Sequence, residues 1–416
     1  MHQTSGKPAR TSSLWHPPWH FILLTALPML LPGLLQAEKK PLPATRTEAA
    51  AAAAVISGTD ANLPADTRGS NAAQAPDAGV PGAVPEPEPD NTAAAGSQSA
   101  FLQQLVQQGI LPLYRELEAA TRNLQQQAET FCHQPDTAGL ETVRQAWSTA
   151  MQAWARTDGL LFGPAIEGQR DFHIWFSPVK KQIIKRLLKQ ADPLTPDTVA
   201  AAGVGAQGLA TLEYLLFDPD LDTPERRTLF NPENPQGCHY LVAASTLLPV
   251  HAASIRQNWE QTGAGFFVSE QEALEVLVNK FYQSIEKVSV SRLGKALNDH
   301  KPYQLDNWRS GQSLLVIQAS MDGIQRLLDR GGIHACLLAL YPADEVRQFI
   351  SALRNQVAFF RRLPIPEQSA FALIRADDTE ALQPYLQRAR SIQLILGIHL
   401  APLIGVNLGF NDNDGD

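Results

Sequence analysis

Glu213 is the residue of this chain whose type and surroundings point most directly to chemistry. It is the one carboxylate in an otherwise apolar and small-residue run, Gly208–Phe217. Positions three and four apart share a face of a helix, so Glu213 lies on one stripe with Ala210 and Phe217. We therefore expect Glu213 to be at least partly buried. An ionised carboxylate in such surroundings costs on the order of several kcal/mol unless a cation, a metal or hydrogen-bond donors compensate.

The candidates for the group that faces Glu213 are polar side chains earlier in the chain: Arg156, Asp158, Arg170, Asp171 and His173. If Asp171 or His173 turns toward Glu213, the ligands are of the kinds that suit zinc or iron. If Arg156 or Arg170 does so, Glu213 becomes half of a buried ion pair, which needs no cofactor. The sequence leaves both arrangements open.

The same run resembles the signature helix of the imelysin-like proteins, whose pattern is Gly-x-His-x-x-Glu followed by an apolar Tyr/Phe-Leu-Leu run. Gly208 and Glu213 match this pattern, and Ala210 stands at the position of the histidine. A histidine and a glutamate three positions apart on a helix can approach a single metal ion. The resemblance therefore implies a metal site, and Ala210 removes one ligand from it. We expect iron or zinc to bind weakly here or not at all.

The resemblance covers roughly residues 101 to 416 and involves ordered matches on both sides of the signature helix. The matching segments are Ala146–Trp147, Trp154–Arg156, Phe162–Pro164, His173–Trp175, Cys238–Leu241, Trp259 and Leu403–Asp416. The resemblance implies an all-α protein with two helical bundles and with the signature helix facing the cleft between them.

The function that the resemblance implies is either catalysis or metal handling, since the family includes metallopeptidases and iron-regulated or iron-uptake proteins. A zinc peptidase must hold its metal and leave a position open for an activated water, and the loss of a ligand at Ala210 weakens the first requirement. Our leading prediction is an exported, non-catalytic protein that acts in iron or other metal acquisition through the cleft around Glu213. The alternatives are an imelysin-type metallopeptidase with altered ligands and a periplasmic adaptor that binds an envelope protein partner.

Catalysis has no independent support from other motifs. The sequence has no Gly-rich phosphate loop, no His-Glu-x-x-His zinc helix and no Gly-x-Ser-x-Gly nucleophile elbow. With a formal net charge of −8, it also lacks the basic stripe that nucleic-acid binding requires. The basic residues of 180–186 are typical of a solvated helix face.

The elements that must position these residues are almost all helical from Phe101 onward, and no alternating strand pattern is present. Helices are expected over 101–131, 140–161, 306–330, 342–363 and 378–402. Helix starts are expected where a capping residue precedes a proline or has capping-box spacing, at Ser177–Pro178, Thr195–Pro196 and Ser269 with Glu272. Short connections between antiparallel helices predict two bundles, 101–265 and 266–416.

The N-terminal residues indicate export to the periplasm. Residues 1–37 combine basic residues, a short apolar stretch from Phe21 to Leu35 and a small-residue cleavage site after Ala37, which predicts a signal peptide. The apolar stretch is shorter than the ~20 residues that span a bilayer, so we expect no membrane span in the mature chain. Residues 38–100 are rich in Ala and Pro and are expected to form a disordered linker.

The three cysteines allow one disulfide and leave one thiol. The first pairing to consider is Cys132 with Cys238, which leaves Cys336 unpaired. A disulfide is compatible with an exported protein.

Overall fold

The computed structural model describes residues 99–218, 229–231 and 233–408, which all belong to one compact unit of the chain. The predicted signal peptide, the predicted linker as far as residue 98 and the C-terminal residues 409–416 lie outside the described residues. Every regular element of the described part is helical, which confirms the all-α prediction. The division into two bundles stays a prediction.

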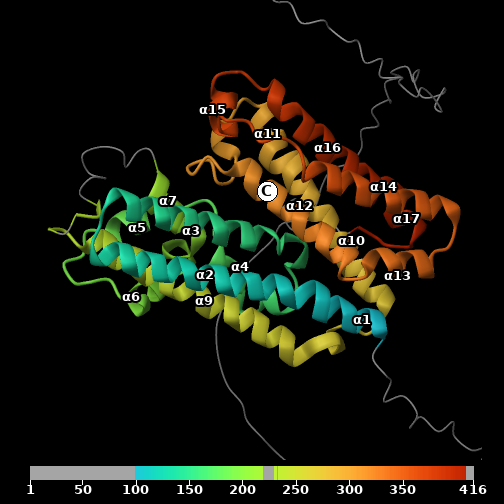
Figure 1. The fold of residues 1–416 in the computed structure, drawn as a ribbon, viewed down its shortest axis with the longest axis horizontal. Helices are drawn as coiled ribbons and strands as arrows, with labels where there is room; N and C mark the ends of the chain where they lie inside the picture. The colour runs from blue at the N-terminus through green and yellow to red at the C-terminus, as the bar shows by residue number, and fades with distance from the viewer. Residues whose placement is uncertain (1–98, 219–228, 232, 409–416) are drawn as a thin grey trace, which may run out of the picture. The chain divides into compact units, whose positions relative to one another are not determined.

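The helices before residue 265 include three long ones, α2, α3 and α9 (Figure 1). In chain order the α-helices of this half are α1 (Ala100–Gln104), α2 (Leu111–His133), α3 (Thr137–Ala155), α4 (Arg170–Ile174), α5 (Lys181–Leu187), α6 (Pro196–Ala201), α7 (Gly208–Phe217) and α9 (Gln236–Thr262). A π-helical turn, Leu105–Ile110, joins α1 to α2. Short 3₁₀ turns occupy Asp158–Leu160, Gly163–Ala165, Glu167–Gln169, Val204–Ala206 and Gly263–Phe266.

The helices after residue 265 are shorter on average. They are α10 (Glu270–Glu286), α11 (Leu293–Asn298), α12 (Ser313–Asp329), α13 (Ile333–Leu340), α14 (Asp344–Phe360), α15 (Ala370–Arg375), α16 (Gln383–Leu394) and α17 (Ala401–Leu403). Two further π-helical turns, Lys287–Arg292 and Ile395–Leu400, lie between α10 and α11 and between α16 and α17. The 3₁₀ turns are Pro302–Gln304 and Glu380–Leu382.

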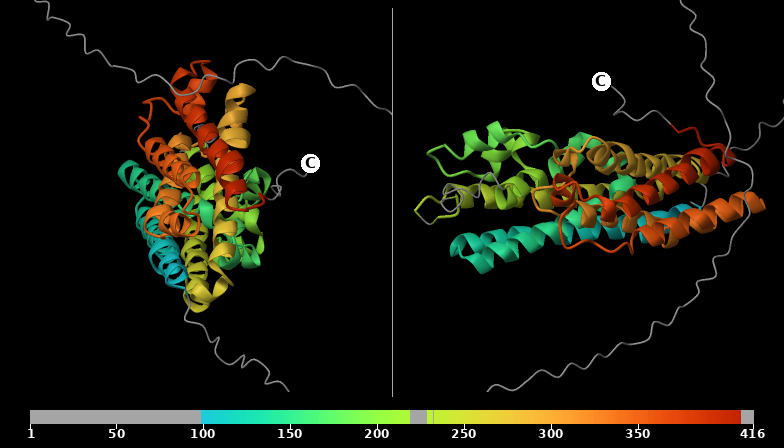
Figure 2. Two further views of the ribbon diagram at one scale, coloured as in Figure 1. Left: turned by 90° about the vertical axis from the view of Figure 1, so that its right-hand side faces the viewer. Right: turned by 90° about the horizontal axis from the view of Figure 1, so that it is seen from above.

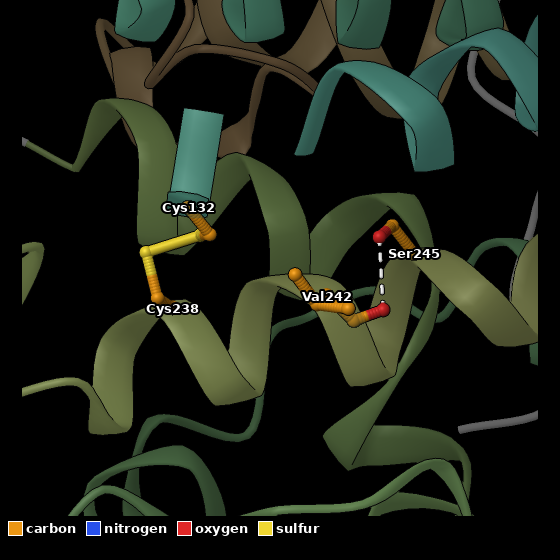
Figure 3. The surroundings of a disulfide bond; sticks show 4 residues. All are labelled: Cys132, Cys238, Val242 and Ser245. Atoms are coloured by element: carbon orange, nitrogen blue, oxygen red, sulfur yellow. Dashed lines mark hydrogen bonds between the residues drawn. A yellow bond between two sulfur atoms is a disulfide. The ribbon is translucent and has the colours of Figure 1, made fainter. Parts of the chain in front are cut away.

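Helices α2 and α9 form an antiparallel pair that runs side by side in Figure 1. At one end, Arg115 near the start of α2 pairs with Glu260 near the end of α9 at 3.1 Å. At the other end, Cys132 of α2 and Cys238 of α9 form a disulfide with their Cα atoms 5.4 Å apart (Figure 3). The two helices are therefore tied together at both ends.

Helix α3 packs directly against α12, so helices from before and after residue 265 share an interface. In both views of Figure 2, orange and red helices from the later part of the chain lie beside blue and green helices from the earlier part. Arg156, which follows α3, donates from Nε to Asp322 of α12 at 3.0 Å. The backbone of Gly323 comes so close to Arg156 that a Cβ at this position would lie 1.9 Å from the Arg156 carbonyl oxygen. Glycine at position 323 is thus required by the close approach of the two segments.

Two of the expected helix starts are confirmed by their caps. The Thr195 hydroxyl accepts from the backbone N–H of Thr198 at the start of α6. Ser269 accepts from the backbone N–H of Glu272 at the start of α10. Each cap satisfies a backbone donor that the first turn of a helix leaves without an intrahelical acceptor.

Two other expected starts are wrong. Helix α5 begins at Lys181, and Ser177–Pro178 lies in a non-helical segment before it, since a Ser-Pro pair also initiates turns. Helix α12 begins at Ser313 rather than at residue 306. Asn307 and Gly311 have φ values of +55° and +72°, which a right-handed helix does not accommodate. Residues 305–312 consequently form a loop.

One described helical stretch, Gln236–Phe266, is long and apolar enough to cross a membrane by length and composition alone. In its most apolar window, 56% of the residues are buried inside the protein. Core helices share this composition, and the contact with α2 accounts for it. The absence of a membrane span in the mature chain stays a prediction.

The Cys132–Cys238 disulfide closes a loop with a sequence separation of 106 residues. In the chain-entropy account, a loop of this length stabilises the folded state by about 4–5 kcal/mol. We expect the Cys132→Ala/Cys238→Ala variant to lose about 3–5 kcal/mol in the free energy of unfolding measured with urea. The Cys336→Ala variant keeps the disulfide and serves as the control. A loss below about 1 kcal/mol in the double variant would contradict the expectation.

Candidate functional site

Helix α7 lines a cavity of about 1160 Å³ with one face, which carries Ala210 and Glu213. The segment before α5 contributes Trp175, and α5 itself contributes its first residue, Lys181. The remaining walls come from residues between 290 and 375. Residues from both sides of position 265 therefore meet at this cavity. We call it the Glu213 cavity.

The start of α7 is fixed by contacts with the surrounding backbone. Gly208 has a φ of +82°, and a Cβ there would lie 2.7 Å from the carbonyl oxygen of Ile174, so only glycine fits. The indole N–H of Trp147 donates to the Leu209 carbonyl at 2.9 Å. The Tyr240 hydroxyl donates to the Ala206 carbonyl at 2.7 Å. These contacts set the position from which Glu213 projects.

Glu213 is 2% exposed, and its partner is Ser310 of the loop 305–312. The Glu213 Oε1 atom accepts from the backbone N–H of Ser310 at 3.0 Å and lies 2.9 Å from the Ser310 hydroxyl. The pKa of Glu213 is raised to about 7, mainly by burial and to a smaller extent by the nearby Asp306 carboxylate. The Ser310 hydrogen bonds and the Arg309 charge oppose this shift.

The loop 305–312 is a tight turn that directs its backbone toward α7. Asn307 and Gly311 supply its two left-handed conformations, which asparagine and glycine tolerate best. The Asn307 carbonyl accepts from the backbone N–H of Gln312 at 3.1 Å, and the Ser313 hydroxyl donates to the Asp306 carbonyl at 2.6 Å. The loop therefore closes on itself.

The Asn307 side chain is 2% exposed and lines the Glu213 cavity. Neither its Nδ2 nor its Oδ1 has a hydrogen-bond partner among the residues that the structure describes. The Oε1 atom of Gln304, which also lines the cavity, is likewise buried without a partner in this part of the chain. Buried polar groups are normally hydrogen-bonded, so these atoms are exceptions among the described residues.

Two cations at the cavity converge on one buried carboxylate, Asp218, which is 0% exposed. Arg309 donates from Nε to Asp218 Oδ2 at 2.5 Å, and Lys181 Nζ lies 3.7 Å from the same oxygen. The Arg309 guanidinium also lies 4.3 Å from the centre of the Trp308 ring. These contacts hold both cations beside α7, although the sequence placed Lys181 on a solvated face.

Three aromatic rings form an apolar wall of the cavity. Trp308 and Phe371 stack with their ring centres 5.0 Å apart, and Tyr303 meets both rings edge to face. Tyr303 is 65% exposed, so this wall reaches the protein surface. It offers a planar apolar surface beside the polar groups of the loop.

The arginines and Asp158 predicted to face Glu213 have other partners. Arg156 pairs with Asp322, and Asp158 Oδ2 lies 3.8 Å from Arg292. Arg170 donates to the Ser254 hydroxyl at 3.0 Å. None of these three lines the Glu213 cavity. The ion pair with Glu213 that the sequence left open is therefore not formed.

Asp171 and His173, the predicted metal ligands, also lie outside the Glu213 cavity. His173 stacks on His251 with ring centres 4.4 Å apart. Burial lowers the pKa of His251 to about 4 and raises that of Asp171. The structure thus brings neither predicted ligand to Glu213.

The loop that supplies the partner of Glu213 is not predicted from the sequence. Asp306-Asn-Trp-Arg-Ser-Gly311 combines polar residues and glycine, which is a loop signal, but the helix expected over 306–330 includes it. The backbone N–H that faces Glu213 has no signature of its own in the sequence.

The cavity residues do not fit a zinc or iron site built from protein ligands alone. In the described part of the chain, no group of three or more His, Cys, Asp or Glu side chains is arranged to hold a metal. Ala210 offers no donor atom, and Asp306 pairs with Arg292 at 2.6 Å. Glu213 is left as a single carboxylate whose Oε1 already accepts from Ser310, whereas such sites use three or four protein ligands.

Comparison with known proteins identifies a family. The family model described as imelysin matches residues 110–384. The iron-regulated protein A of Synechococcus elongatus is 24% identical over 237 residues, which cover 53% of this chain and 62% of that protein. The match thus spans less than two thirds of the relative's length.

Two solved structures share the fold. An imelysin-like protein from Psychrobacter arcticum superposes with a TM-score of 0.61 at 20% identity and covers 74% of this chain and 96% of its own. A putative iron-regulated protein A precursor from Parabacteroides distasonis superposes with a TM-score of 0.58 at 16% identity. The superposition covers 75% of this chain and 97% of that protein.

The raised pKa of Glu213 predicts a pH-dependent stability. Below pH 4.5, its usual pKa, the carboxyl is protonated in both the folded and the unfolded state. Between pH 4.5 and about 7 it ionises only in the unfolded state, so the free energy of unfolding falls as the pH rises, by about 3 kcal/mol in total. The Glu213→Gln variant keeps an oxygen that accepts from Ser310. Because its amide does not ionise, its free energy of unfolding should not show this decrease.

The measurement is urea unfolding of the wild type and Glu213→Gln at several pH values from 4.5 to 8. We expect the stability of the variant relative to the wild type to increase over this range and to level off above about pH 7. Parallel profiles for the two proteins would show that Glu213 does not titrate as described.

Proposed function

Since the chain belongs to the imelysin family, we propose that it is an exported, non-catalytic binding protein that acts in iron or other metal acquisition. The observation that carries the proposal is the buried Glu213 at the wall of a large cavity, on the helix that matches the family signature. The relative named iron-regulated protein A supports the link to iron.

The non-catalytic part of the proposal rests on the donor set of the Glu213 cavity. A hydrolytic metal needs protein ligands and an open position for water. Position 210 has no donor atom, and Glu213 is engaged with Ser310. A binding role asks only that the cavity recognise its ligand, which its polar and aromatic walls can do.

Export is supported by two independent features. The disulfide between Cys132 and Cys238 is a bond that forms and persists in oxidising compartments such as the bacterial periplasm. The N-terminal residues have the composition of a signal peptide with cleavage after Ala37. Both features support a periplasmic location of the mature protein.

Iron retention tests the proposal. The mature chain from Glu38 is dialysed against iron-limited growth medium to which Fe³⁺ is added, and the retained iron is counted by mass spectrometry. We expect about one iron per chain for the wild type and at least a tenfold loss for Glu213→Ala, because the variant alters the cavity wall. Glu345→Ala, at an exposed position outside the cavity, is the control. A wild type that retains no iron would refute metal acquisition.

The Ala210→His variant tests whether the signature helix keeps the geometry of a metal site. The new imidazole lies three positions from Glu213 on the same face, so both side chains can approach one ion. We expect Zn²⁺ to bind at least tenfold more tightly than to the wild type in calorimetric titration. The gain should vanish in Ala210→His/Glu213→Gln. A gain that persists in the double variant would place the zinc elsewhere.

A further inference from the structure

The charge of the Glu213 cavity is unlike that of a site for a bare metal cation. Four cationic side chains and two carboxylates line it, the cations being Lys181, Lys295, Arg309 and Arg375. Asp306 is balanced by Arg292, and Asp218 behind the wall balances part of the charge of Lys181 and Arg309. An excess of positive charge remains, which repels a bare cation and attracts an anion.

Two of these cations are available at the outer part of the cavity. Lys295 at α11 and Arg375 at the end of α15 are both exposed, and we call them the rim cations. Neither forms an ion pair with another residue of the described ranges, in contrast to Lys181 and Arg309. They can therefore bind an anionic group without first giving up a protein partner.

The amide side chains without hydrogen-bond partners define a second requirement for the ligand of the cavity. The Asn307 side chain needs both a donor and an acceptor, and Gln304 Oε1 needs a donor. A carboxylate offers acceptors only, whereas a hydroxyl offers both kinds of group. A ligand that satisfies the rim cations and Asn307 together therefore carries carboxylates and at least one hydroxyl.

The size of the cavity also favours a chelate over a bare ion. A metal ion held by protein ligands sits about 2 Å from each of them, which needs little space. A cavity of about 1160 Å³ is slightly larger than the pockets of roughly 300–1,000 Å³ that hold whole organic ligands. The aromatic wall of Tyr303, Trp308 and Phe371 can cover the apolar carbons of such a ligand.

We propose that the Glu213 cavity binds a hydroxycarboxylate anion, with the rim cations holding its carboxylates and Asn307 its hydroxyl group. The inference rests on the proposed function in one respect: iron enters the cavity as the centre of such an anionic chelate, whose ligands come from the chelator. Glu213 then borders the ligand and does not coordinate the metal. This explains why the cavity lacks the ligands of a protein-only metal site.

The test is calorimetric titration of the mature protein with citrate, ferric citrate, tricarballylate, Fe²⁺ and Zn²⁺. Tricarballylate is citrate without its hydroxyl group and serves as the matched ligand. We expect citrate and ferric citrate to bind, tricarballylate to bind at least tenfold more weakly than citrate, and the bare ions not to bind in the cavity. Absence of citrate and ferric citrate binding would overturn the proposal.

Two sets of variants measure separately what the rim cations and the Asn307 amide contribute to citrate binding. Lys295→Gln/Arg375→Gln should weaken citrate binding at least tenfold. The matched control is Lys189→Gln/Arg330→Gln, whose exposed cations lie outside the cavity. Asn307→Gly keeps the left-handed backbone and removes the amide, so it should bring citrate affinity down to that of tricarballylate. Unchanged citrate affinity in the rim variant would overturn the proposal.

Failure of this inference can be told apart from failure of the proposed function. If citrate binds with the rim and amide dependence described, but ferric citrate does not bind, the anion site stands and metal acquisition fails. If Fe²⁺ or Zn²⁺ binds in a Glu213-dependent manner and neither citrate form does, metal acquisition stands and the hydroxycarboxylate proposal is overturned.

Discussion

The burial of Glu213 is the constraint on which the site depends. A carboxylate that is 2% exposed must be neutral or must be met by donors, and here the backbone N–H and hydroxyl of Ser310 meet it. The donors belong to a loop some hundred residues further along the chain, so the contact ties the loop 305–312 to α7. The cavity forms between these two segments.

The rest of the fold holds α7 and the loop 305–312 in fixed positions relative to each other. Helix α7 is fixed by the hydrogen bonds from Trp147 and Tyr240 to its first turn and the residues before it. The loop leads directly into α12, which packs on α3 where Gly323 lets the backbones approach closely. The α2 and α9 pair, tied by the disulfide, packs against both α3 and α7 and supports them. A cavity with a buried carboxylate needs this rigid support because a buried polar group that loses its hydrogen bonds is costly, and those bonds require fixed distances and angles.

The chemistry of the Glu213 cavity follows from the residues that line it where a metal site would have its protein ligands. The chain keeps the glycine and glutamate of the imelysin signature but has alanine at the histidine position. Around Glu213, the wall carries cations, amides, aromatic rings and one further carboxylate, Asp306, which pairs with Arg292; no imidazole is among the described residues that line it. Such a wall recognises an organic ligand through charge, hydrogen bonding and planar contact, as small-molecule sites generally do.

The sequence by itself determined the helical class, the helical conformation of the run Gly208–Phe217 and the burial of Glu213, because these follow from the local spacing of apolar residues and from a short signature pattern. It also indicated the cap at Thr195, from the proline that follows it, and the cap at Ser269, from its spacing to Glu272. Only the tertiary structure decided which group meets Glu213. The sequence offered side chains from 156 to 173, whereas the partner is a backbone N–H at Ser310, and every residue except proline carries such a donor. The pairing arises from the packing of distant segments, which local patterns do not encode.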